Sequence, residues 1–324
     1  MKIVFHCATP LPVKTYGGIE RIVFWHMVEL SRLGHKVVLI GHPDSDVKKF
    51  GIEHIPYANA DLDWERLIPL DTDIAHLSYN HQVRSGLPTL CTVHGNGQLG
   101  ERFLPNSVFV SKRHAQIHGA KEFVHNALDF SEYPFNEDKE INWNRFLFLA
   151  KGSWRVKNLR HCIRACRRTK KHLEIIGGRS LFPWPRIKSH GFVGGKEKLS
   201  IMENCDALLF PVRWEEPFGI AIIEAMAMGL PVIGSPYGSL PELVTEELGI
   251  ICKNFEELVM YLSTDNSKKF NPRKIRETAK ERFSIEKHSK AYLEYYEKIL
   301  SGQELHSTAP KLIGQKRAES LLDF

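Results

Sequence analysis

Residues 207–234 have the sequence ALLFPVRWEEPFGIAIIEAMAMGLPVIG. The apolar runs Ala207–Phe210 and Pro231–Gly234 have the length and continuity typical of strands that are covered on both faces. Between them, Ile220–Met228 has the pattern of a helix. A strand, a helix and a second strand in this order form the unit from which parallel sheets are built. This stretch therefore predicts an α/β fold.

The same alternation extends over most of the chain. Further helices are expected at Ile19–Leu33, Pro272–Phe283 and Ile285–Leu300. Further strands are expected at Lys2–His6, Lys36–Ile40, Ile74–Leu77, Thr89–Val93, Ser107–Val110, Arg145–Leu149, Leu173–Ile176 and Gly249–Cys252. The pattern breaks once, at Asp129–Asn144, which is polar, contains a proline and has no sheet period, as expected of an interdomain linker. The chain thus predicts two Rossmann-like, doubly wound domains that face a cleft.

The length of 324 residues is sufficient for two domains, each with its own core. We expect an N-terminal Rossmann-like domain at residues 1–140 and a C-terminal one at residues 141–302. Residues 303–324 are polar and of mixed charge, and predict a loosely docked or mobile tail.

The composition is that of an ordinary globular protein, with 43% hydrophobic and 25% charged residues. It disfavours a disordered or coiled-coil protein. The net charge of +6 is mild; it suits anionic ligands such as phosphates and does not indicate a nucleic-acid-binding protein. The sequence contains no apolar run of about 18 residues, the length that a membrane-spanning helix requires.

The six cysteines are scattered and lack the spacing of a zinc site. They predict buried, reduced thiols and therefore a cytoplasmic protein. The short pairs Asp61-Leu62-Asp63 and Asp71-Thr72-Asp73 resemble a D-x-D metal motif, but such pairs are common, and we interpret them as turn and cap residues. No metal site is predicted.

Two strand-to-helix loops could bind an anion. Gly17-Gly18 lies between the first strand and the first helix, where glycines allow a ligand close to backbone N–H groups; a plain tight turn is the alternative. Lys151 and Lys157 follow the strand Arg145–Leu149 and suit a diphosphate. Residues 151–172 hold nine Lys or Arg and no acid, so the later basic residues form either a solvated helix face or a surface for phosphate-rich or anionic membrane partners.

The loop and helix within residues 207–234 carry the most specific chemistry. Glu216 to Gly219 lie in the loop that follows the strand Ala207–Phe210, and Gly219 leaves backbone N–H groups exposed at the helix start. Glu224 lies inside the helix on an otherwise apolar face. A carboxylate there is costly unless it binds donors, and ribose or sugar hydroxyls would serve.

The pattern Glu216-Pro217-Phe218-Gly219, followed by Glu224-Ala225-Met226-Ala227 and Pro231-Val232, resembles the E-x7-E motif of family 4 retaining glycosyltransferases, which have the GT-B fold. Further similarities follow the order of that family over roughly residues 1–300. They are the Gly17-Gly18 loop, Thr92-Val93-His94-Gly95, Asn126-Ala127-Leu128-Asp129, the pair Lys151 and Lys157, and Tyr292–Leu300, which resembles a terminal helix that crosses back to the first domain.

This resemblance implies a role for each matching residue. Glu224 would bind the donor ribose, and Glu216, with the backbone of Phe218, Gly219 and Ile220, would hold the transferred sugar. Lys151 and Lys157 would neutralise the leaving diphosphate, Gly17-Gly18 would meet the donor phosphate, and His94 would line the reaction centre.

The resemblance further implies a metal-independent hexosyltransferase that retains the anomeric configuration, with a UDP-sugar or GDP-sugar as co-substrate and no other cofactor. It leaves the acceptor open among lipid-linked, saccharide and small-molecule hydroxyls, and leaves open peripheral contact with the inner membrane face. Base specificity is expected around Gly191-Phe192-Val193.

Two departures from the family pattern leave alternatives open. Ala150-Lys151 replaces the usual Gly-Arg, which exchanges bidentate phosphate binding for a point charge, and Ala127 replaces a glycine. A catalytically silent binding or scaffold protein on the same fold therefore stays an alternative. A GT-B-like nucleotide-sugar epimerase is a second alternative, although Glu216 and Glu224 argue against it.

Overall fold

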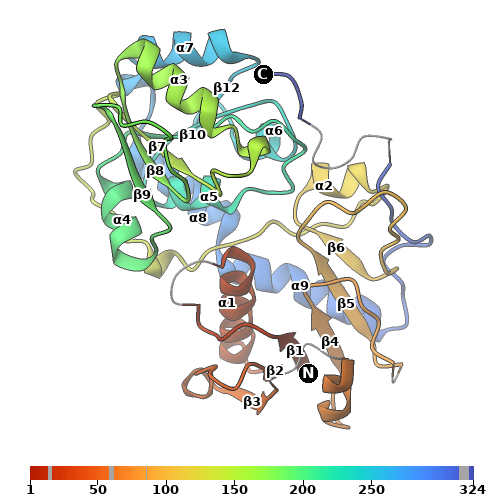
Figure 1. Ribbon diagram of the computed structural model, residues 1–324. Helices are drawn as coiled ribbons and strands as arrows, with labels where there is room; N and C mark the ends of the chain where they lie inside the picture. The colour runs from red at the N-terminus through yellow and green to blue at the C-terminus, as the bar shows by residue number, and fades with distance from the viewer. Residues whose placement is uncertain (14–16, 58–61, 85, 314–320) are drawn as a thin grey trace. The chain divides into compact units, whose positions relative to one another are not determined.

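The computed structural model describes residues 1–13, 17–57, 62–84, 86–313 and 321–324 (Figure 1). These residues form two compact units. Unit 1 contains the described residues of 1–128 together with 285–313, and unit 2 contains residues 129–284 and 321–324.

Unit 1 is built on a six-stranded parallel sheet with the strand order β3-β2-β1-β4-β5-β6. Its helices are α1 (Gly18–Arg32), α2 (Lys112–Ile117) and α9 (Ile285–Leu300), with short 3-10 helices η1 (Lys48–Phe50) and η2 (Leu62–Leu67). The strands are β1 (Lys2–Cys7), β2 (Lys36–Gly41), β3 (Ile52–Pro56), β4 (Ile74–Leu77), β5 (Thr89–Val93) and β6 (Ser107–Phe109).

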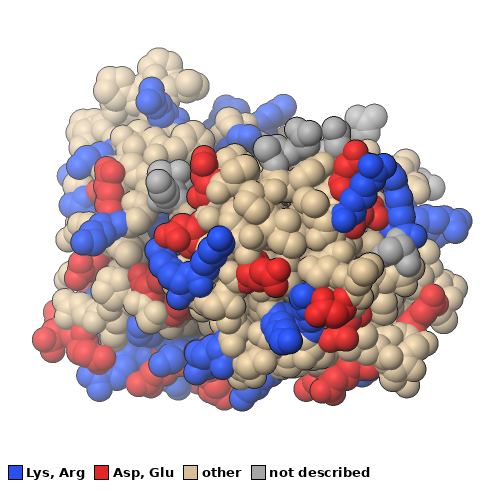
Figure 2. Space-filling model, turned by 90° about the horizontal axis from the view of Figure 1, so that it is seen from below, with Lys and Arg blue, Asp and Glu red and all other residues tan. Residues whose placement is uncertain are grey.

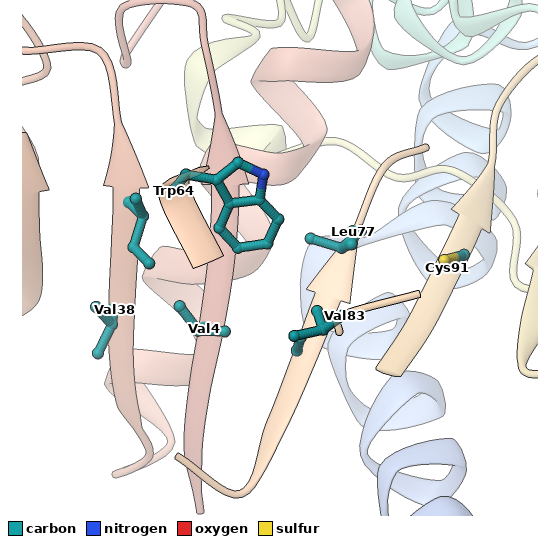
Figure 3. Close-up of a cluster of buried hydrophobic side chains, with 8 residues drawn as sticks. Val4, Val38, Trp64, Leu77, Val83 and Cys91 are labelled. Carbon is teal, nitrogen blue, oxygen red and sulfur yellow. The ribbon is translucent and has the colours of Figure 1, made fainter. Parts of the chain in front are cut away.

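The core of unit 1 forms where apolar side chains from neighbouring strands meet. Val4, Val38, Leu77 and Cys91 come from β1, β2, β4 and β5, and Trp64 packs against them from η2 (Figure 3). All five side chains are almost completely buried. Strands of a parallel sheet are covered on both faces, which explains why they appear in the sequence as nearly continuous apolar runs.

Helix α9 is attached to unit 1 by a buried polar network. The hydroxyl of Tyr296 lies 3.0 Å from Nε2 of His26 on α1 and 2.5 Å from Nδ1 of His76 on β4. The hydroxyl of Tyr292 lies 2.7 Å from Oγ1 of Thr92, which also contacts His76. Burial lowers the pKa of both histidines well below the ordinary value, so both are neutral at pH 7.

Unit 2 is built on a second six-stranded parallel sheet, with the order β12-β11-β10-β7-β8-β9. The strands are β7 (Arg145–Leu149), β8 (His172–Ile176), β9 (Ile187–Gly191), β10 (Ala207–Phe210), β11 (Val232–Gly234) and β12 (Gly249–Ile251). The helices are α3 (Leu159–Thr169), α4 (Gly195–Glu203), α5 (Ile220–Ala227), α6 (Leu240–Leu243), α7 (Phe255–Ser263) and α8 (Pro272–Phe283), with 3-10 helices η3 (Phe130–Glu132), η4 (Arg155–Lys157) and η5 (Ser267–Lys269).

The expected α/β class and parallel sheets are confirmed, and each strand predicted from an apolar run lies within one residue of its observed bounds. Strands β3 and β9 were not predicted. Both lie at the outer edges of their sheets, and their side chains are largely half-buried or exposed, so they lack the apolar run on which the prediction depended. Edge position thus explains both omissions.

The segment 129–144 is part of unit 2, whereas its polar composition predicted a linker. It contains no strand, as expected, but Phe130, Tyr133, Ile141 and Trp143 are buried. Trp143 donates from Nε1 to the carbonyl of Tyr261 at 2.8 Å. These buried residues are irregularly spaced and do not recur with the period of a helix or a strand. The sequence pattern therefore did not predict that the segment packs against the rest of unit 2.

The unit boundaries also differ from the expected 1–140, 141–302 and 303–324. Unit 1 ends its first segment at Leu128, and α9 belongs to it, as expected of a terminal helix that crosses back. Residues 303–313 pack on unit 1, where His306 bonds the carbonyl of Ser107 at 2.8 Å. Residues 321–324 belong to unit 2, where the amide of Leu322 donates to the carbonyl of Arg213 at 2.8 Å. Hydrogen bonds to backbone carbonyls hold these polar segments, and composition does not reveal such contacts.

The six cysteines are free thiols, and all but Cys7 are buried, as expected. Among the described residues, no helix combines the length and the hydropathy needed to cross a bilayer. On the face drawn in Figure 2, basic and acidic side chains are interspersed, in keeping with the small net charge.

Candidate functional site

The N-terminus of α5 is the centre of the candidate site in unit 2. Gly219 precedes the helix with φ 82°, a left-handed conformation that favours glycine. A Cβ atom at this position would lie 3.0 Å from Cδ1 of Ile222 and 3.1 Å from Phe210. Gly219, the N-cap residue, has no side chain with which to cap the helix, so the first backbone N–H groups, including that of Ile220, can donate to a ligand.

Glu216 lies in the loop between β10 and α5 and is buried. Its Oε2 atom accepts hydrogen bonds from Nζ of Lys157 at 2.6 Å and from Nε1 of Trp214 at 2.7 Å. The ammonium of Lys157 also lies 4.8 Å from the centre of the Trp214 ring. The two donors therefore stabilise the carboxylate of Glu216, and the Trp214 ring stabilises the ammonium of Lys157.

The backbone around Glu216 is closely packed against the segment after β11. The amide of Ser239 donates to the carbonyl of Glu216 at 2.9 Å, and the hydroxyl of Ser239 donates to the carbonyl of Phe218 at 2.8 Å. Gly238 passes so close that a Cβ there would lie 2.1 Å from the amide nitrogen of Glu216. The side chain of Phe218 is buried, so it packs in the core and offers only its backbone to a ligand.

Glu224, on α5, is engaged by two residues from other elements. Its Oε1 atom accepts a hydrogen bond from Nζ of Lys198 on α4 at 2.6 Å and from the hydroxyl of Tyr133 at 2.7 Å. Lys198 and Glu224 are 7% and 6% exposed. The carboxylate therefore has the donors that its position on an apolar helix requires. These partners are protein groups, whereas the sequence suggested ligand hydroxyls.

Lys151 lies at the carboxyl end of β7 and is exposed. Its Nζ atom is 5.2 Å from the ring centre of Trp154. The following residue, Gly152, donates its amide to the carbonyl of Gly177 at 2.8 Å, so the loop after β7 lies against the loop after β8. Lys151 thus carries an exposed positive charge at the carboxyl ends of the strands, where ligands of open α/β sheets bind.

His94 follows β5 in unit 1. Burial and the neighbouring His288 lower the pKa of His94 to about 3, so the imidazole is neutral at pH 7. Its Nδ1 atom is buried and has no hydrogen-bond partner among the residues that the structure describes. A buried, unpaired ring nitrogen is costly and is available to a ligand.

Gly17 and Gly18 lie at the start of α1 in unit 1. Gly17 has φ 149°, and a Cβ there would lie 3.0 Å from Oε2 of Glu20. Its N-cap residue, Gly17, has no side chain with which to cap this helix either, so an anion could bind its N-terminal amides in place of a cap.

The structure thus brings Lys157 to Glu216 within unit 2 and joins Glu224 to two residues that the sequence did not suggest. Tyr133 was missed because it lies in the presumed linker. Lys198 was missed because a lysine in an amphipathic helix is ordinarily exposed; its only sequence signal is the spacing of four residues to the buried Met202.

The basic residues of α3 make contacts within unit 2. Arg167 lies 3.3 Å from the ring centre of Trp184, Arg164 lies 4.8 Å from that of Phe255, and Arg168 pairs with Glu256 at 2.9 Å. These contacts account for part of the positive stretch without any ligand.

No group of three or more metal-ligating side chains occurs in the part of the chain that the structure describes. Of the two D-x-D pairs, Asp71 accepts from Nζ of Lys2 at 2.7 Å and Asp73 accepts from the amide of the same residue at 2.7 Å. Asp61 lies outside the described residues. Asp71 and Asp73 therefore bind the start of β1.

Part of unit 2 matches a known protein family. Residues 144–263 match the family described as "Glycosyl transferases group 1". An uncharacterized 41.2 kDa protein in the cps region of Klebsiella pneumoniae is 40% identical over 68 residues, which are 21% of this chain and 19% of that protein. An uncharacterized glycosyltransferase of Methanocaldococcus jannaschii is 40% identical over 58 residues, which are 18% of this chain and 15% of that protein. The matches thus span less than a fifth of the length of these relatives.

Solved structures resemble the chain over nearly its whole length. AviGT4, a glycosyltransferase involved in avilamycin A biosynthesis, superposes with a TM-score of 0.75 at 20% identity, covering 93% of this chain and 98% of that one. Anabaena Alr3699/HepE, in complex with UDP and glucose, has a TM-score of 0.67 at 18% identity, covering 91% and 98%. The chain therefore has the fold of the GT-B glycosyltransferases, and its second unit contains a segment that matches the group 1 glycosyl transferases.

Proposed function

We propose that this protein transfers a sugar from a nucleoside diphosphate donor to an acceptor hydroxyl with retention of the anomeric configuration. One observation carries the proposal: two buried carboxylates, Glu216 in the loop before α5 and Glu224 on α5, are paired with the half-buried Lys157 and the buried Lys198. The carboxylates can accept hydrogen bonds from sugar hydroxyls, and the lysines and the first amides of α5 can donate to a phosphate.

Within this proposal, Glu216 and the amides of Gly219 and Ile220 bind the hydroxyls of the transferred sugar, and Glu224 binds the ribose. The hydrogen bonds from Lys198 and Tyr133 to Oε1 hold the carboxylate of Glu224 in place on α5.

Lys157 and Lys151 stabilise the charge that develops on the leaving diphosphate. An ammonium has three N–H donors, and the structure describes one hydrogen bond from Lys157, to Glu216. The remaining donors can therefore bind a phosphate oxygen while the pair with Glu216 holds the ammonium in place. This positive charge supports leaving-group departure without a metal ion.

In unit 1, His94 and the Gly17-Gly18 turn offer further groups that suit a sugar and a phosphate. A neutral imidazole with an unpaired Nδ1 can accept a hydrogen bond from a sugar hydroxyl near the anomeric carbon. The uncapped start of α1 can donate to the donor phosphate.

The donor is proposed to be a UDP-sugar or GDP-sugar. Support comes from Anabaena Alr3699/HepE, which shares the fold and whose structures contain UDP, UDP with glucose, or UDP-glucose. Lipid-linked, saccharide and small-molecule acceptors all present the hydroxyl that the reaction requires.

A panel of UDP-, GDP-, ADP- and dTDP-sugars, each with its free nucleoside diphosphate, tests the proposal by thermal shift and calorimetry. A ligand present at 100 times its Kd stabilises the folded state by about 2.7 kcal/mol, so one nucleotide is expected to raise Tm clearly. Glu224→Gln should weaken that ligand at least about tenfold, whereas Glu256→Gln, an exposed residue of the same unit, should not. Nuclear magnetic resonance of the product reports retention or inversion.

No shift with any nucleotide, in a folded sample, would favour the catalytically silent protein. Binding without transfer to any hydroxyl would also favour it. Interconversion of two nucleotide-sugars without an acceptor would instead identify an epimerase.

A further inference from the structure

The connection between β8 and β9 exposes two adjacent apolar side chains. Leu181 is 93% exposed and Phe182 is 66% exposed, and Leu181 is the most exposed large apolar residue among the described residues of unit 2. Single exposed apolar residues are normal, but an adjacent pair at this level of exposure in one connection indicates a surface for a partner. We call residues 177–186 the β8–β9 loop.

The β8–β9 loop is anchored on both sides of this apolar pair. Gly178 forms an antiparallel bridge with Gly191, and Trp184 forms another with Ile187. The hydroxyl of Ser180 donates to the carbonyl of Phe182 at 2.8 Å. The backbone therefore holds Leu181 and Phe182 outward instead of allowing them to fold back on unit 2.

Basic residues lie on both sides of the apolar pair in the sequence. Residues 175–196 contain Arg179, Arg186, Lys188 and Lys196 and no acidic residue. The C-terminal end of α3 adjoins the loop as well, since Arg167 lies 3.3 Å from the ring centre of Trp184 and Arg186 donates to the carbonyl of Lys170 at 2.9 Å. The loop that carries the apolar pair and the adjoining end of α3 are therefore both basic.

We propose that the β8–β9 loop and the basic end of α3 dock unit 2 onto an anionic lipid bilayer. Leu181 and Phe182 enter the boundary between headgroups and acyl chains, Trp184 lies at the headgroup level, and the arginines and lysines contact anionic headgroups. A nucleic acid would match the positive charge, but the side chain of Leu181 offers it neither a hydrogen bond nor a ring for stacking. The apolar pair therefore favours the bilayer.

Docking has a consequence that rests on the proposed function. If unit 2 binds a nucleotide-sugar, this surface brings the donor to a membrane in which a lipid-borne acceptor hydroxyl is concentrated. Lipid binding itself requires no nucleotide, so the two proposals can fail separately.

Co-sedimentation of the full chain with vesicles tests the docking. Vesicles of phosphatidylglycerol and phosphatidylcholine in equal amounts should bind the protein at least about tenfold more tightly than vesicles of phosphatidylcholine alone. Raising the salt from 0.1 M to 1 M shortens the Debye length from about 10 Å to about 3 Å and should weaken the binding.

The double variant Leu181→Ser, Phe182→Ser should bind the anionic vesicles at least about tenfold more weakly. Met260→Ser removes a half-exposed apolar side chain from α7 and is the matched control, which should bind as the wild type does. Thermal melting and the nucleotide shift of the double variant should be unchanged, because both substituted residues are exposed and lie outside the candidate site.

Three results would overturn the docking. They are no binding of the wild type to anionic vesicles, equal binding by the wild type and the double variant, and tighter binding to a DNA duplex that the double variant retains. The second result would mean that electrostatic attraction alone holds the protein on the vesicles and that Leu181 and Phe182 take no part. A nucleotide panel without any shift would refute sugar transfer and leave the vesicle result in place.

Discussion

The substitution Lys198→Met removes the positive charge that lies against Glu224 inside unit 2. Nζ of Lys198 is 2.6 Å from Oε1 of Glu224, and both residues are almost completely buried. Removal of one partner of a buried pair costs about 3–5 kcal/mol because an uncompensated charge is left behind. The hydroxyl of Tyr133 still donates to Glu224, so we expect a loss near the lower limit, about 3 kcal/mol.

Urea unfolding followed by tryptophan fluorescence measures this loss, because four of the six tryptophans lie in unit 2. Lys196→Met, an exposed lysine on the same helix, is the control and should change the free energy of unfolding by less than about 0.5 kcal/mol. The double variant Lys198→Met, Glu224→Gln removes both charges. It should lose at least about 1 kcal/mol less than the sum of the two single variants.

Two results would refute this account of the pair. One is a loss below about 1 kcal/mol for Lys198→Met, which would mean that solvent or another group compensates Glu224. The other is a double variant whose loss equals the sum of the single losses within about 0.5 kcal/mol, which would mean that the two side chains do not interact.

Three further predictions concern the effect of pH on stability, two glycine substitutions and the removal of metal ions. Burial lowers the pKa of His288 to about 4 and that of His26 well below its ordinary value, so the unfolded chain binds more protons below pH 6.5. The free energy of unfolding should therefore fall by up to about 1.4 kcal/mol per histidine for each pH unit below about 6.5, which lowers Tm between pH 7 and pH 5; an unchanged Tm would contradict the burial. Gly238→Ala, at φ 61°, should lower the free energy of unfolding in urea by at least about 2 kcal/mol and weaken donor binding, because the new Cβ would collide with the backbone of Glu216. Gly302→Ala also has a positive φ but has no atom within 4 Å of the new Cβ, so it should cost about 1 kcal/mol and leave binding unchanged. Equal losses for the two variants would refute the close approach of Gly238 to Glu216. EDTA should leave sugar transfer intact, and a large loss restored by manganese would refute metal independence.

The fold was largely predictable because strands that are buried on both faces appear as apolar runs. Strands such as Ile74–Leu77 and Thr89–Val93 were predicted with their observed bounds. The edge strands Ile52–Pro56 and Ile187–Gly191 were not, because one side of an edge strand faces solvent and its composition resembles that of a loop. The buried aromatic residues of segment 129–144 have no period and were therefore mistaken for a linker.

The sequence by itself determined the order of the elements and the loop–helix motif with its two glutamates, since both depend on local spacing. Only the tertiary structure decided the partners of those carboxylates. Lys157 is 59 residues from Glu216, and Glu224 is 26 residues from Lys198 and 91 from Tyr133. Spacing along one helix determines which side chains share a face. Contacts between distant segments depend on how the sheet and helices pack, which no local pattern specifies.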